Sequence, residues 1–444
     1  MSGEAHPGGV TPVGPEPGSR LPRALRPFAL RQYRILALAV VASLLGAGVW
    51  LVAVVWQVIS LGGGPQDLSL VATAGSLGLV AAVLFGGVAA DRIPQKWILV
   101  ATESAKAVAV GAAGVLAYTG QVEVWHLAGV AMVLGIADGF FYPAYSALLP
   151  SVLPPDQLLA ANGVEGVLRP TVMNAAGPAL ASALIAVAAP WLAMLVVAAA
   201  QGLAVVVLLF LTTTAVRRET APAEHPLRAV FSDLAGGFRY LARTPWLLGT
   251  LLFATVLILL IMGPIEVLMP FAVKDQAGGG ASAYALALAA FGVGGAAGSL
   301  LVASLPLPRR YLSLMVMLWG LGCLPLIVIG YTSRLWLMVV ALFVVGFAAS
   351  AATVIWGTLL QRRVPPELLG RVSSLDFFVS LALMPVSMAL AGPVGNAIGI
   401  GPAFLIAGAA PPLLAVITIF AARMPADEIA HPLDRAGTAA EVRS

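Results

Sequence analysis

The stretch that decides the fold is residues 86–96, which read GGVAADRIPQK and form a short charged segment between two long apolar runs. The upstream run extends over residues 68–90 and the downstream run over residues 97–118. Each run is about long enough to cross a bilayer as an α-helix, which takes roughly 20 apolar residues. The charged segment is therefore predicted to be a turn at the membrane surface, and Gly87 within it is expected to let another helix approach closely.

Composition places the chain among integral membrane proteins. Of its 444 residues, 60% are hydrophobic and only 10% are charged, and the mean hydropathy is +0.97. That is more apolar surface than a soluble domain could bury. The net charge of +4 does not indicate a nucleic-acid partner, because the cations cluster in loops that alternate along the chain. Cys323 lies in an apolar run and the four histidines fall in tails, loops or a helix end, so neither a metal nor another cofactor is predicted.

Twelve apolar segments are long enough to span a membrane, in two groups of six. In the first half, helices are expected at residues 35–60, 68–90, 97–118, 124–149, 158–188 and 191–213. In the second half, they are expected at residues 246–273, 283–305, 312–331, 336–361, 366–398 and 402–422. Pro and Gly clusters separate them. The predicted fold is all-α integral membrane, with twelve transmembrane helices in two parallel six-helix repeats.

Polar segments divide the chain around these helices. Residues 1–30 are predicted to be a disordered cytoplasmic tail, because they are rich in Pro and Gly and lack the apolar core of a signal peptide. The six-helix halves occupy residues 31–215 and 246–424. A cytoplasmic linker at residues 216–245 joins them, and its amphipathic stretch is expected to lie along the membrane surface. Residues 425–444 are predicted to be a second cytoplasmic tail.

Lysine and arginine are distributed unevenly between the two sides of the predicted bundle. Of the 24 Lys and Arg residues, 20 fall on the side of the N-terminus, and Lys274 and Arg334 fall on the other side. Because cytoplasmic loops carry the excess of cations, both termini of this cell-membrane protein are predicted to be cytoplasmic. The remaining two cations lie inside predicted helices. One of them, Lys106, is three residues from Glu103, and the two are expected to neutralise each other.

The two halves also repeat each other in sequence. Residues 148–156 contain a Leu-Leu pair followed by VLPPD, and residues 359–367 contain a Leu-Leu pair followed by RVPPE. Some twenty residues later, each half has a Gly-Pro pair, at residues 177–178 and 392–393. These matches lie at corresponding places in the two groups of helices, and they predict parallel six-helix repeats.

The pattern G-x-x-x-D-R-x-x-x-K at residues 87–96, between the second and third predicted helices, resembles the signature loop of the major facilitator superfamily. The chain departs from the usual pattern at Pro94 and Gln95, where the family commonly has Gly and Arg. Further motifs are similar to those of the branch that contains the enterobactin exporter, macrolide efflux proteins and Tap-type drug efflux pumps. These motifs are the Leu-Leu-Pro turn with Asn162, the sequence GFRYL at residues 237–241, and Pro-Ile-Glu at residues 264–266. The resemblance covers about residues 30–423 and implies export of small molecules by alternating access between the halves.

The signature segment is predicted to act as a conformational gate. Asp91 is expected to face the cytoplasmic N-terminus of the eleventh helix, where the positive end of the helix dipole and Arg371 would hold it. Together with Gly87, Arg92 and Lys96, this contact would latch the cytoplasmic side of the transporter shut.

Ionisable residues inside spans are costly in lipid and are candidates for substrate or proton sites. Glu165 and Arg169 are four residues apart, and a carboxylate beside an arginine stays ionised, which suits substrate binding. Asn174 on the same helix and Trp50 on the first helix are further candidates for substrate binding. For Trp50, packing between helices is the alternative.

Glu266 is expected to be the proton-coupling residue. No cation lies within four residues of it on its helix, and a carboxylate in a low-dielectric cavity favours its neutral form. Pro264 and Pro270 flank it, so this helix is expected to bend between states. Asp138 and Asp376 are the next candidates for proton coupling. The alternative roles are a hydrogen bond between helices for Asp138 and solvation by nearby serines for Asp376.

The leading hypothesis is proton-coupled efflux of a hydrophobic or amphipathic compound such as a drug, siderophore or secondary metabolite. No Gly-x-x-x-x-Gly-Lys-Ser/Thr motif is present, so an ion gradient is the expected energy source. The partners expected are a small-molecule substrate, protons and the lipid bilayer, and the protein is expected to be a monomer. A proton-coupled importer and a non-transporting membrane scaffold or sensor are the alternatives. An enzyme is not expected, since no nucleophile, base and orienting group occur together at a helix end.

Overall fold

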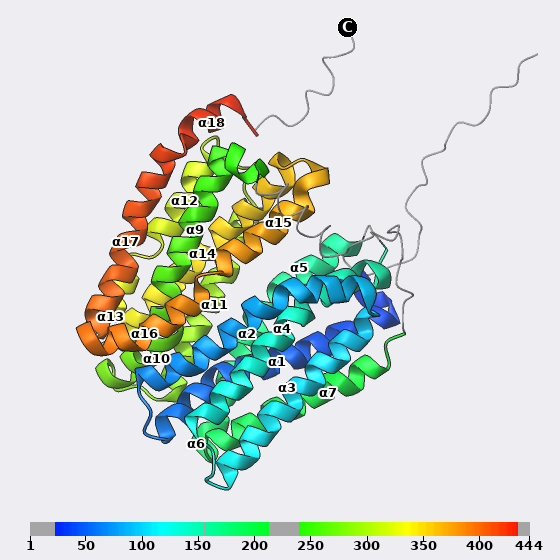
Figure 1. Ribbon diagram of the computed structural model, residues 1–444, viewed down its shortest axis with the longest axis vertical. Coiled ribbons are helices and arrows are strands. Elements are labelled where there is room, and N and C mark those ends of the chain that lie inside the picture. The colour runs from blue at the N-terminus through cyan, green and yellow to red at the C-terminus, as the bar shows by residue number, and fades with distance from the viewer. Residues whose placement is uncertain (1–22, 155–156, 213–238, 434–444) are drawn as a thin grey trace, which may run out of the picture.

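The computed structural model describes residues 23–154, 157–212 and 239–433. These residues contain twelve helices that are long and apolar enough to cross a membrane, so the predicted number of spans is confirmed. The helices form two bundles of six, one from each half of the chain (Figure 1). The amphipathic stretch of the linker lies mostly outside the described residues, and so do residues 1–22 and 434–444 of the tails.

The spans of the N-terminal half have the following bounds. They are α1 (Arg31–Ser60), α2 (Pro65–Arg92), α3 (Gln95–Tyr118), α4 (Val124–Val152), the fifth span made of α5 (Leu158–Leu168), η3 (Arg169–Ala176) and α6 (Gly177–Val187), and α7 (Pro190–Leu209). A short 3-10 helix, η1 (Arg23–Ala29), precedes α1.

The C-terminal half follows the same order. Its spans are α9 (Pro245–Gly263) continued by η4 (Pro264–Leu268), α10 (Met269–Phe271) and η5 (Ala272–Gln276), then α11 (Ala281–Ala303), α12 (Tyr311–Leu321) with α13 (Leu326–Tyr331), α14 (Leu335–Arg363), α15 (Pro366–Leu381) with α16 (Met384–Ile398), and α17 (Ile400–Ala421). A short helix, α18 (Met424–Ala430), follows.

Local chemistry explains why the second span begins earlier than the apolar run suggests. Gly62 has φ of 79°, a left-handed conformation that ends the preceding helix in a turn. Pro65 occupies the first turn of α2, where its missing N–H is not needed. The carboxylate of Asp67 accepts a hydrogen bond from the Gly64 N–H (2.9 Å) and caps the helix. The start of α2 therefore rests on polar and turn residues, which a search for apolar residues overlooks.

Small residues allow the closest helix pairs within each half. In the N-terminal half α2 packs along α4, and a Cβ atom added to Gly139 of α4 would lie 2.7 Å from the Cβ of Ala82. In the C-terminal half α11 packs along α14 in the corresponding way, with Gly294 and Gly346 at the contact. Such small-residue contacts are how membrane helices approach without a hydrophobic driving force. The two equivalent pairs show the sequence repeat in three dimensions.

The halves contact each other where α16 packs on α2 and where α11 packs on η3 and α6 (Figure 1). At the start of α2, Ser69 Oγ accepts a hydrogen bond from the Gly392 N–H of α16 (2.6 Å). The rings of Trp56 on α1 and Tyr284 on α11 stack with centroids 5.6 Å apart. These contacts therefore lie at the end of the bundle that carries the α1–α2 loop and the loop before α11. The described ends of the chain lie at the other end of the bundle, because the number of spans is even.

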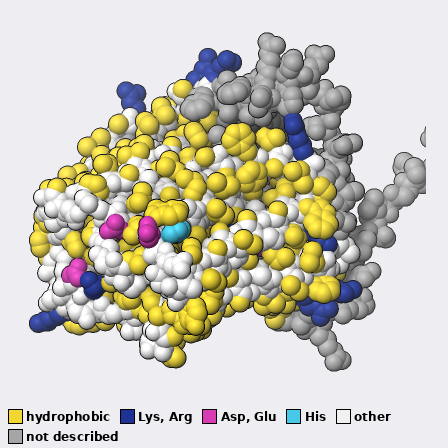
Figure 2. Space-filling model, turned by 60° about the horizontal axis from the view of Figure 1, so that its bottom comes forward, with side chains coloured by type: hydrophobic (Ala, Val, Ile, Leu, Met, Phe, Trp, Pro, Cys, Tyr) yellow, Lys and Arg dark blue, Asp and Glu magenta, His cyan; other side chains and the backbone are white. Residues whose placement is uncertain are grey.

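The end of the molecule that carries these loops has few charged side chains. Figure 2 looks at this end and shows mainly hydrophobic and uncharged surface, with a few acidic side chains and Lys or Arg near the edges of the view. The distribution agrees with the uneven placement of cations in the sequence.

Helix α18 anchors the described part of the C-terminal segment to the second bundle. The carboxylate of Glu428, which is 3% exposed, accepts hydrogen bonds from Ser313 N–H (2.6 Å) and Oγ (3.1 Å) at the start of α12. Asp427 forms an ion pair with Arg363 at the end of α14. Nothing in the sequence analysis anticipated this helix, because it has only seven residues and its partners are far away along the chain.

Candidate functional site

A buried ionic network joins three spans of the N-terminal half. Lys106 on α3 lies 3.3 Å from Glu103 Oε1 on the same helix and 2.6 Å from Asp138 Oδ1 on α4. Ser43 on α1 donates a hydrogen bond to Glu103 Oε1 (2.9 Å). The side chain of Glu103 is 0% exposed, that of Lys106 is 5% exposed and that of Asp138 is 38% exposed. The structure therefore connects the predicted Glu103–Lys106 pair with Asp138, which the sequence analysis treated separately.

A second ion pair lies beside this network. Arg169 Nη2 is 2.8 Å from Glu165 Oε1, as the spacing of four residues predicts. The guanidinium of Arg169 also donates to the hydroxyl of Tyr142 on α4 (3.0 Å), and it lies over the Tyr142 ring at 5.1 Å. Arg169 begins the π-helical segment η3, which also contains Asn174. Interruptions of this kind are frequent at functional sites.

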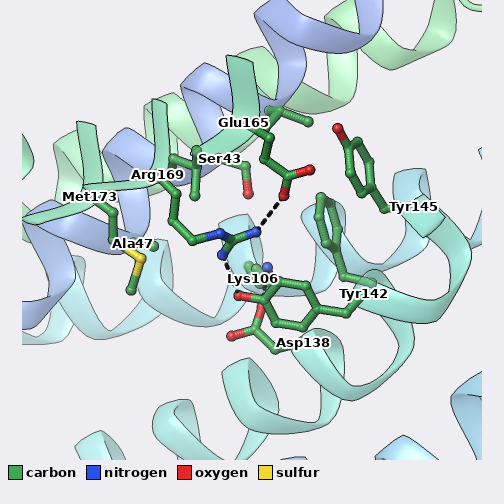
Figure 3. Close-up of a pocket in the computed structure, with 12 residues that line it drawn as sticks. Ser43, Ala47, Lys106, Asp138, Tyr142, Tyr145, Glu165, Arg169 and Met173 are labelled. Atoms are coloured by element: carbon green, nitrogen blue, oxygen red, sulfur yellow. Dashed lines mark hydrogen bonds and ion pairs between the residues drawn. The ribbon is translucent and has the colours of Figure 1, made fainter. Parts of the chain in front are cut away.

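Lys106 and Asp138 of the first group and the Glu165–Arg169 pair line one small cavity of about 50 Å³. Figure 3 shows Arg169 and Lys106 extending into the same space, with Tyr142 and Asp138 beside them. Val40 and Leu44 of α1 and Met173 of η3 contribute apolar lining. A cavity of this size holds about one or two water molecules. Drug-sized ligands need pockets of roughly 300 Å³ or more, so in this conformation the cavity suits water and protons.

The charges in the network do not balance. One ammonium, that of Lys106, serves the two carboxylates of Glu103 and Asp138, whereas Arg169 and Glu165 neutralise each other. In addition, Glu103 Oε2 is buried and has no hydrogen-bond partner in the described part of the chain. An excess negative charge and an unpartnered carboxylate oxygen inside a membrane protein are unfavourable. Addition of one proton to either carboxylate removes the excess charge.

Glu266 lies elsewhere, in the seventh span. Its π-helical segment η4 begins at Pro264, so the backbone departs from a regular α-helix next to this proline. The expected bending of this helix between states remains a prediction. The side chain of Glu266 is exposed, while Ile265 and Val267 beside it are buried. Among the residues the structure describes, Glu266 has no ion-pair partner. Its proposed role in proton coupling remains a prediction.

Asp376 is the remaining candidate for proton coupling. It accepts hydrogen bonds from Trp356 Nε1 on α14 (2.9 Å) and from Ser380 Oγ on its own helix (3.3 Å). The contact with Ser380 agrees with the expected solvation by serines. The hydrogen bond from the indole was not anticipated. The hydrogen bond from Trp356 joins α14 to α15.

Two further predicted substrate residues lie outside the charged cavity. Trp50 on α1 is partly buried and packs against the hydrophobic core, as in the packing alternative. Asn174 on η3 lies against Gly292 of α11, at a contact between the halves. The structure therefore does not bring Trp50 or Asn174 together with Glu165 and Arg169, and their role in substrate binding remains a prediction.

The signature segment differs in detail from the expected gate. Among the residues the structure describes, a Cβ atom added to Gly87 would meet no atom within 4 Å, so in this conformation none of them approaches Gly87 closely. The neighbouring Gly86 provides the close approach to another helix, packing against Gly139 and Phe140 of α4. Lys96 is 9% exposed, and its ammonium donates to the carbonyls of Leu209 (2.8 Å) and Leu211 (2.5 Å) at the end of α7. Lys96 thus caps a helix within its own half.

The expected latch between Asp91 and Arg371 concerns side chains that lie outside the described residues, although both positions belong to helices, α2 and α15. Arg92, the neighbour of Asp91, is exposed at the end of α2. The latch remains a prediction.

Sequence reasoning overlooked Lys106 and Tyr142 as site residues. Lys106 lies in the middle of a predicted span, where a cation is rare, and that position was a usable signal. Its pairing with nearby Glu103 on the same helix hid the longer-range contact with Asp138. Tyr142 carried no comparable signal, because a tyrosine in a membrane helix is ordinarily a packing residue.

Comparison with known proteins gives consistent relationships. Residues 23–438 match the major facilitator family described as transmembrane secretion effector. The multidrug efflux pump Tap of Mycolicibacterium fortuitum is 30% identical over 394 residues, which is 85% of this chain and 93% of that protein. Macrolide efflux protein A of Streptococcus pyogenes is 24% identical over 82% of this chain and 90% of that protein.

Solved structures agree on the fold. The nucleoside transporter NupG has a TM-score of 0.66 at 13% identity, covering 87% of this chain and 98% of that one. A bacterial homologue of the human lysosomal transporter Spinster, in an inward-facing and occupied conformation, has a TM-score of 0.64 at 16% identity, covering 92% of this chain and 99% of that one.

Proposed function

Because the chain belongs to the major facilitator superfamily, as a multi-pass membrane transporter of its efflux-pump branch and not an enzyme, we propose that it exports a hydrophobic or amphipathic compound in exchange for protons. The names of the relatives support export of drug-like molecules. The distribution of Lys and Arg supports cytoplasmic termini, so that the end shown in Figure 2 faces outward.

The observation that carries proton coupling is the unbalanced buried network of Glu103, Lys106 and Asp138. With one cation and two carboxylates, the site has a net charge of minus one, and binding of one proton makes it neutral. Asp138 is the proton-exchanging group in this proposal, since its side chain is 38% exposed and water can reach it. Glu103 is fully buried and keeps Lys106 in place.

Protonation of Asp138 would have a direct structural effect. The neutral carboxyl attracts Lys106 less strongly, so the ammonium is left with Glu103 on its own helix and the ionic link between α3 and α4 weakens. Because the same cavity contains Arg169 and Tyr142, the repacking would reach the π-helical segment of the fifth span. That segment contacts α11 of the other half. In this proposal, protonation acts next to a surface that must change during alternating access.

The proposal is tested with Asp138→Asn in proteoliposomes loaded with a fluorescent hydrophobic cation such as ethidium. We expect loss of efflux driven by a pH gradient, with downhill exchange of the dye retained. Asp275→Asn, which alters an exposed aspartate paired with neighbouring Lys274, is the matched control and should behave as the wild type. Full pH-driven efflux in Asp138→Asn would remove Asp138 from the coupling role, and Glu266 would then be tested first.

The direction of transport is tested separately. In everted vesicles an exporter accumulates the dye when the lumen is acidic, and substrate entry is accompanied by proton exit. A proton-coupled importer shows substrate and proton moving together. A scaffold or sensor shows no transport in either arrangement.

A further inference from the structure

An apolar groove of about 400 Å³ runs along the outside of the N-terminal half, between α3 and α4. Ala101 and Ala105 of α3 form part of its floor, and Trp97, Ile136 and Phe140 form its walls. Trp97 and Ile136 are 49% and 41% exposed. Figure 1 places α3 on the side of this half that faces away from the C-terminal half. The groove therefore opens toward the bilayer and is separate from the charged cavity.

The dimensions of the groove fit one leaflet of a membrane. On α3 the lining residues extend from Trp97 to Ala105, and eight residues of helix rise about 12 Å. The hydrocarbon core of a bilayer is about 30 Å thick, so one leaflet measures roughly 15 Å. Trp97 lies three residues after the α2–α3 turn, at the depth where tryptophan marks the membrane interface. The groove thus begins at the interface and runs parallel to lipid tails for most of one leaflet.

A cation lies at the interfacial end of this groove. Ile93 lines the groove next to the α2–α3 turn, and the preceding residue, Arg92, is exposed. Lys96, the other cation of this turn, is already bonded to two carbonyl oxygens of the α7 end. Arg92 is therefore the cation available to a negatively charged headgroup, and arginine is well suited to bind phosphate.

We propose that this groove is a binding site for an anionic phospholipid of the leaflet on the side of the chain termini, with one acyl chain between α3 and α4 and the phosphate at Arg92. Small residues on the floor leave room for the tail, and large apolar residues on both sides hold it. The negative headgroup adds specificity that a purely apolar groove lacks.

The test uses phosphatidylglycerol and phosphatidylcholine that carry the same photoreactive acyl chain, reconstituted with the full-length protein. Labelled peptides are mapped by mass spectrometry. We expect labelling of the α3–α4 groove several-fold above other lipid-facing positions, with phosphatidylglycerol preferred. Ala101→Phe with Ala105→Phe should fill the groove and abolish the excess. Ala112→Phe, at an exposed position on the same helix outside the groove, is the matched control and should leave it unchanged.

The variant Arg92→Gln tests whether Arg92 binds the lipid phosphate. It should remove the preference for phosphatidylglycerol. Labelling of the groove no stronger than at other lipid-facing helices would show ordinary surrounding lipid and overturn the site. Equal labelling by the two lipids, or a preference retained in Arg92→Gln, would overturn the role of Arg92. Displacement of the photolipid by ethidium in an intact bilayer would assign the groove to transported compounds and also overturn the proposal.

Discussion

Replacement of Lys106 by methionine tests the ionic network directly. Lys106 Nζ lies 2.6 Å from Asp138 and 3.3 Å from Glu103, and its side chain is 5% exposed. Breaking a buried ion pair by removing one partner destabilises a protein by about 3–5 kcal/mol, because the other charge stays buried. Since Asp138 is 38% exposed and is partly hydrated, most of the loss should come from Glu103. We therefore expect Lys106→Met to lower the unfolding free energy by about 3 kcal/mol, the lower end of that range.

The assay is thermal unfolding of the purified protein in detergent, followed by tryptophan fluorescence. The apparent midpoint of Lys106→Met should fall by several degrees. Lys274→Met is the matched control, because Lys274 pairs with Asp275 at 3.3 Å but the two side chains are 45% and 54% exposed. An exposed pair contributes only about 0–1 kcal/mol, so this control should unfold close to the wild type.

A second variant identifies the cause of the loss. In Lys106→Met with Glu103→Gln, the carboxylate that would be left without its cation is replaced by a neutral amide. We expect the double variant to recover at least half of the lost stability. Two results would refute this reasoning. Either the double variant is no more stable than Lys106→Met, or Lys106→Met and Lys274→Met unfold alike. In both cases the uncompensated charge of Glu103 does not cause the loss of stability.

Three further predictions concern movement and coupling. Glu266→Gln tests the alternative proton carrier: with Asp138 as the exchanging group, the variant should keep pH-driven efflux, whereas loss of pH-driven efflux with downhill exchange spared would give the coupling role to Glu266. Trp56→Ala removes an aromatic stack worth about 0.5–1.5 kcal/mol, so we expect a shift of about two- to tenfold toward outward-facing states. Thiol labelling of cysteines introduced near the outer loops, after Cys323→Ser, measures this shift, and unchanged labelling would contradict it. Asp91→Asn should shift the protein toward inward-facing states, because a helix-dipole contact of about 0.3–1 kcal/mol is lost; the latch fails if cytoplasmic labelling is unaltered.

The number and order of the spans were predictable because each span corresponds to a long, mostly apolar run of the sequence. Their ends were less predictable, as α2 shows: it starts at Pro65 through a turn and a cap made by Asp67. The π-helical segments were only partly foreseen. The prolines of the seventh span led to the expectation that it bends between states, whereas the π-helical form depends on how the freed backbone groups are satisfied by neighbouring turns.

The candidate site was predictable only as far as local spacing reaches. Glu165 and Arg169 are one turn apart, so their ion pair follows from the helix itself. The contact of Lys106 with Asp138 depends on how α3 and α4 lie against each other, which no local pattern records. Gly86 and Gly87 illustrate the same limit. The sequence shows that a helix can approach closely at this pair of glycines, but only the packing of α2 on α4 shows that Gly86 makes the contact.

The position of α1 explains how a proton in one half can influence the contact between the halves. This helix is one continuous α-helix of 30 residues with no internal proline to kink it. Ser43 near its middle is hydrogen-bonded to Glu103 of the ionic network, and Trp56 near its outer end stacks on Tyr284 of the other half. Thirteen residues of helix separate these two contacts, a distance of about 20 Å. We infer that a rearrangement around Lys106 is transmitted along α1 to the outer contact, because a rigid helix bonded at both places cannot adjust at one without a strain at the other. If Ser43→Ala leaves the outer labelling unchanged at every pH, this route through α1 is excluded.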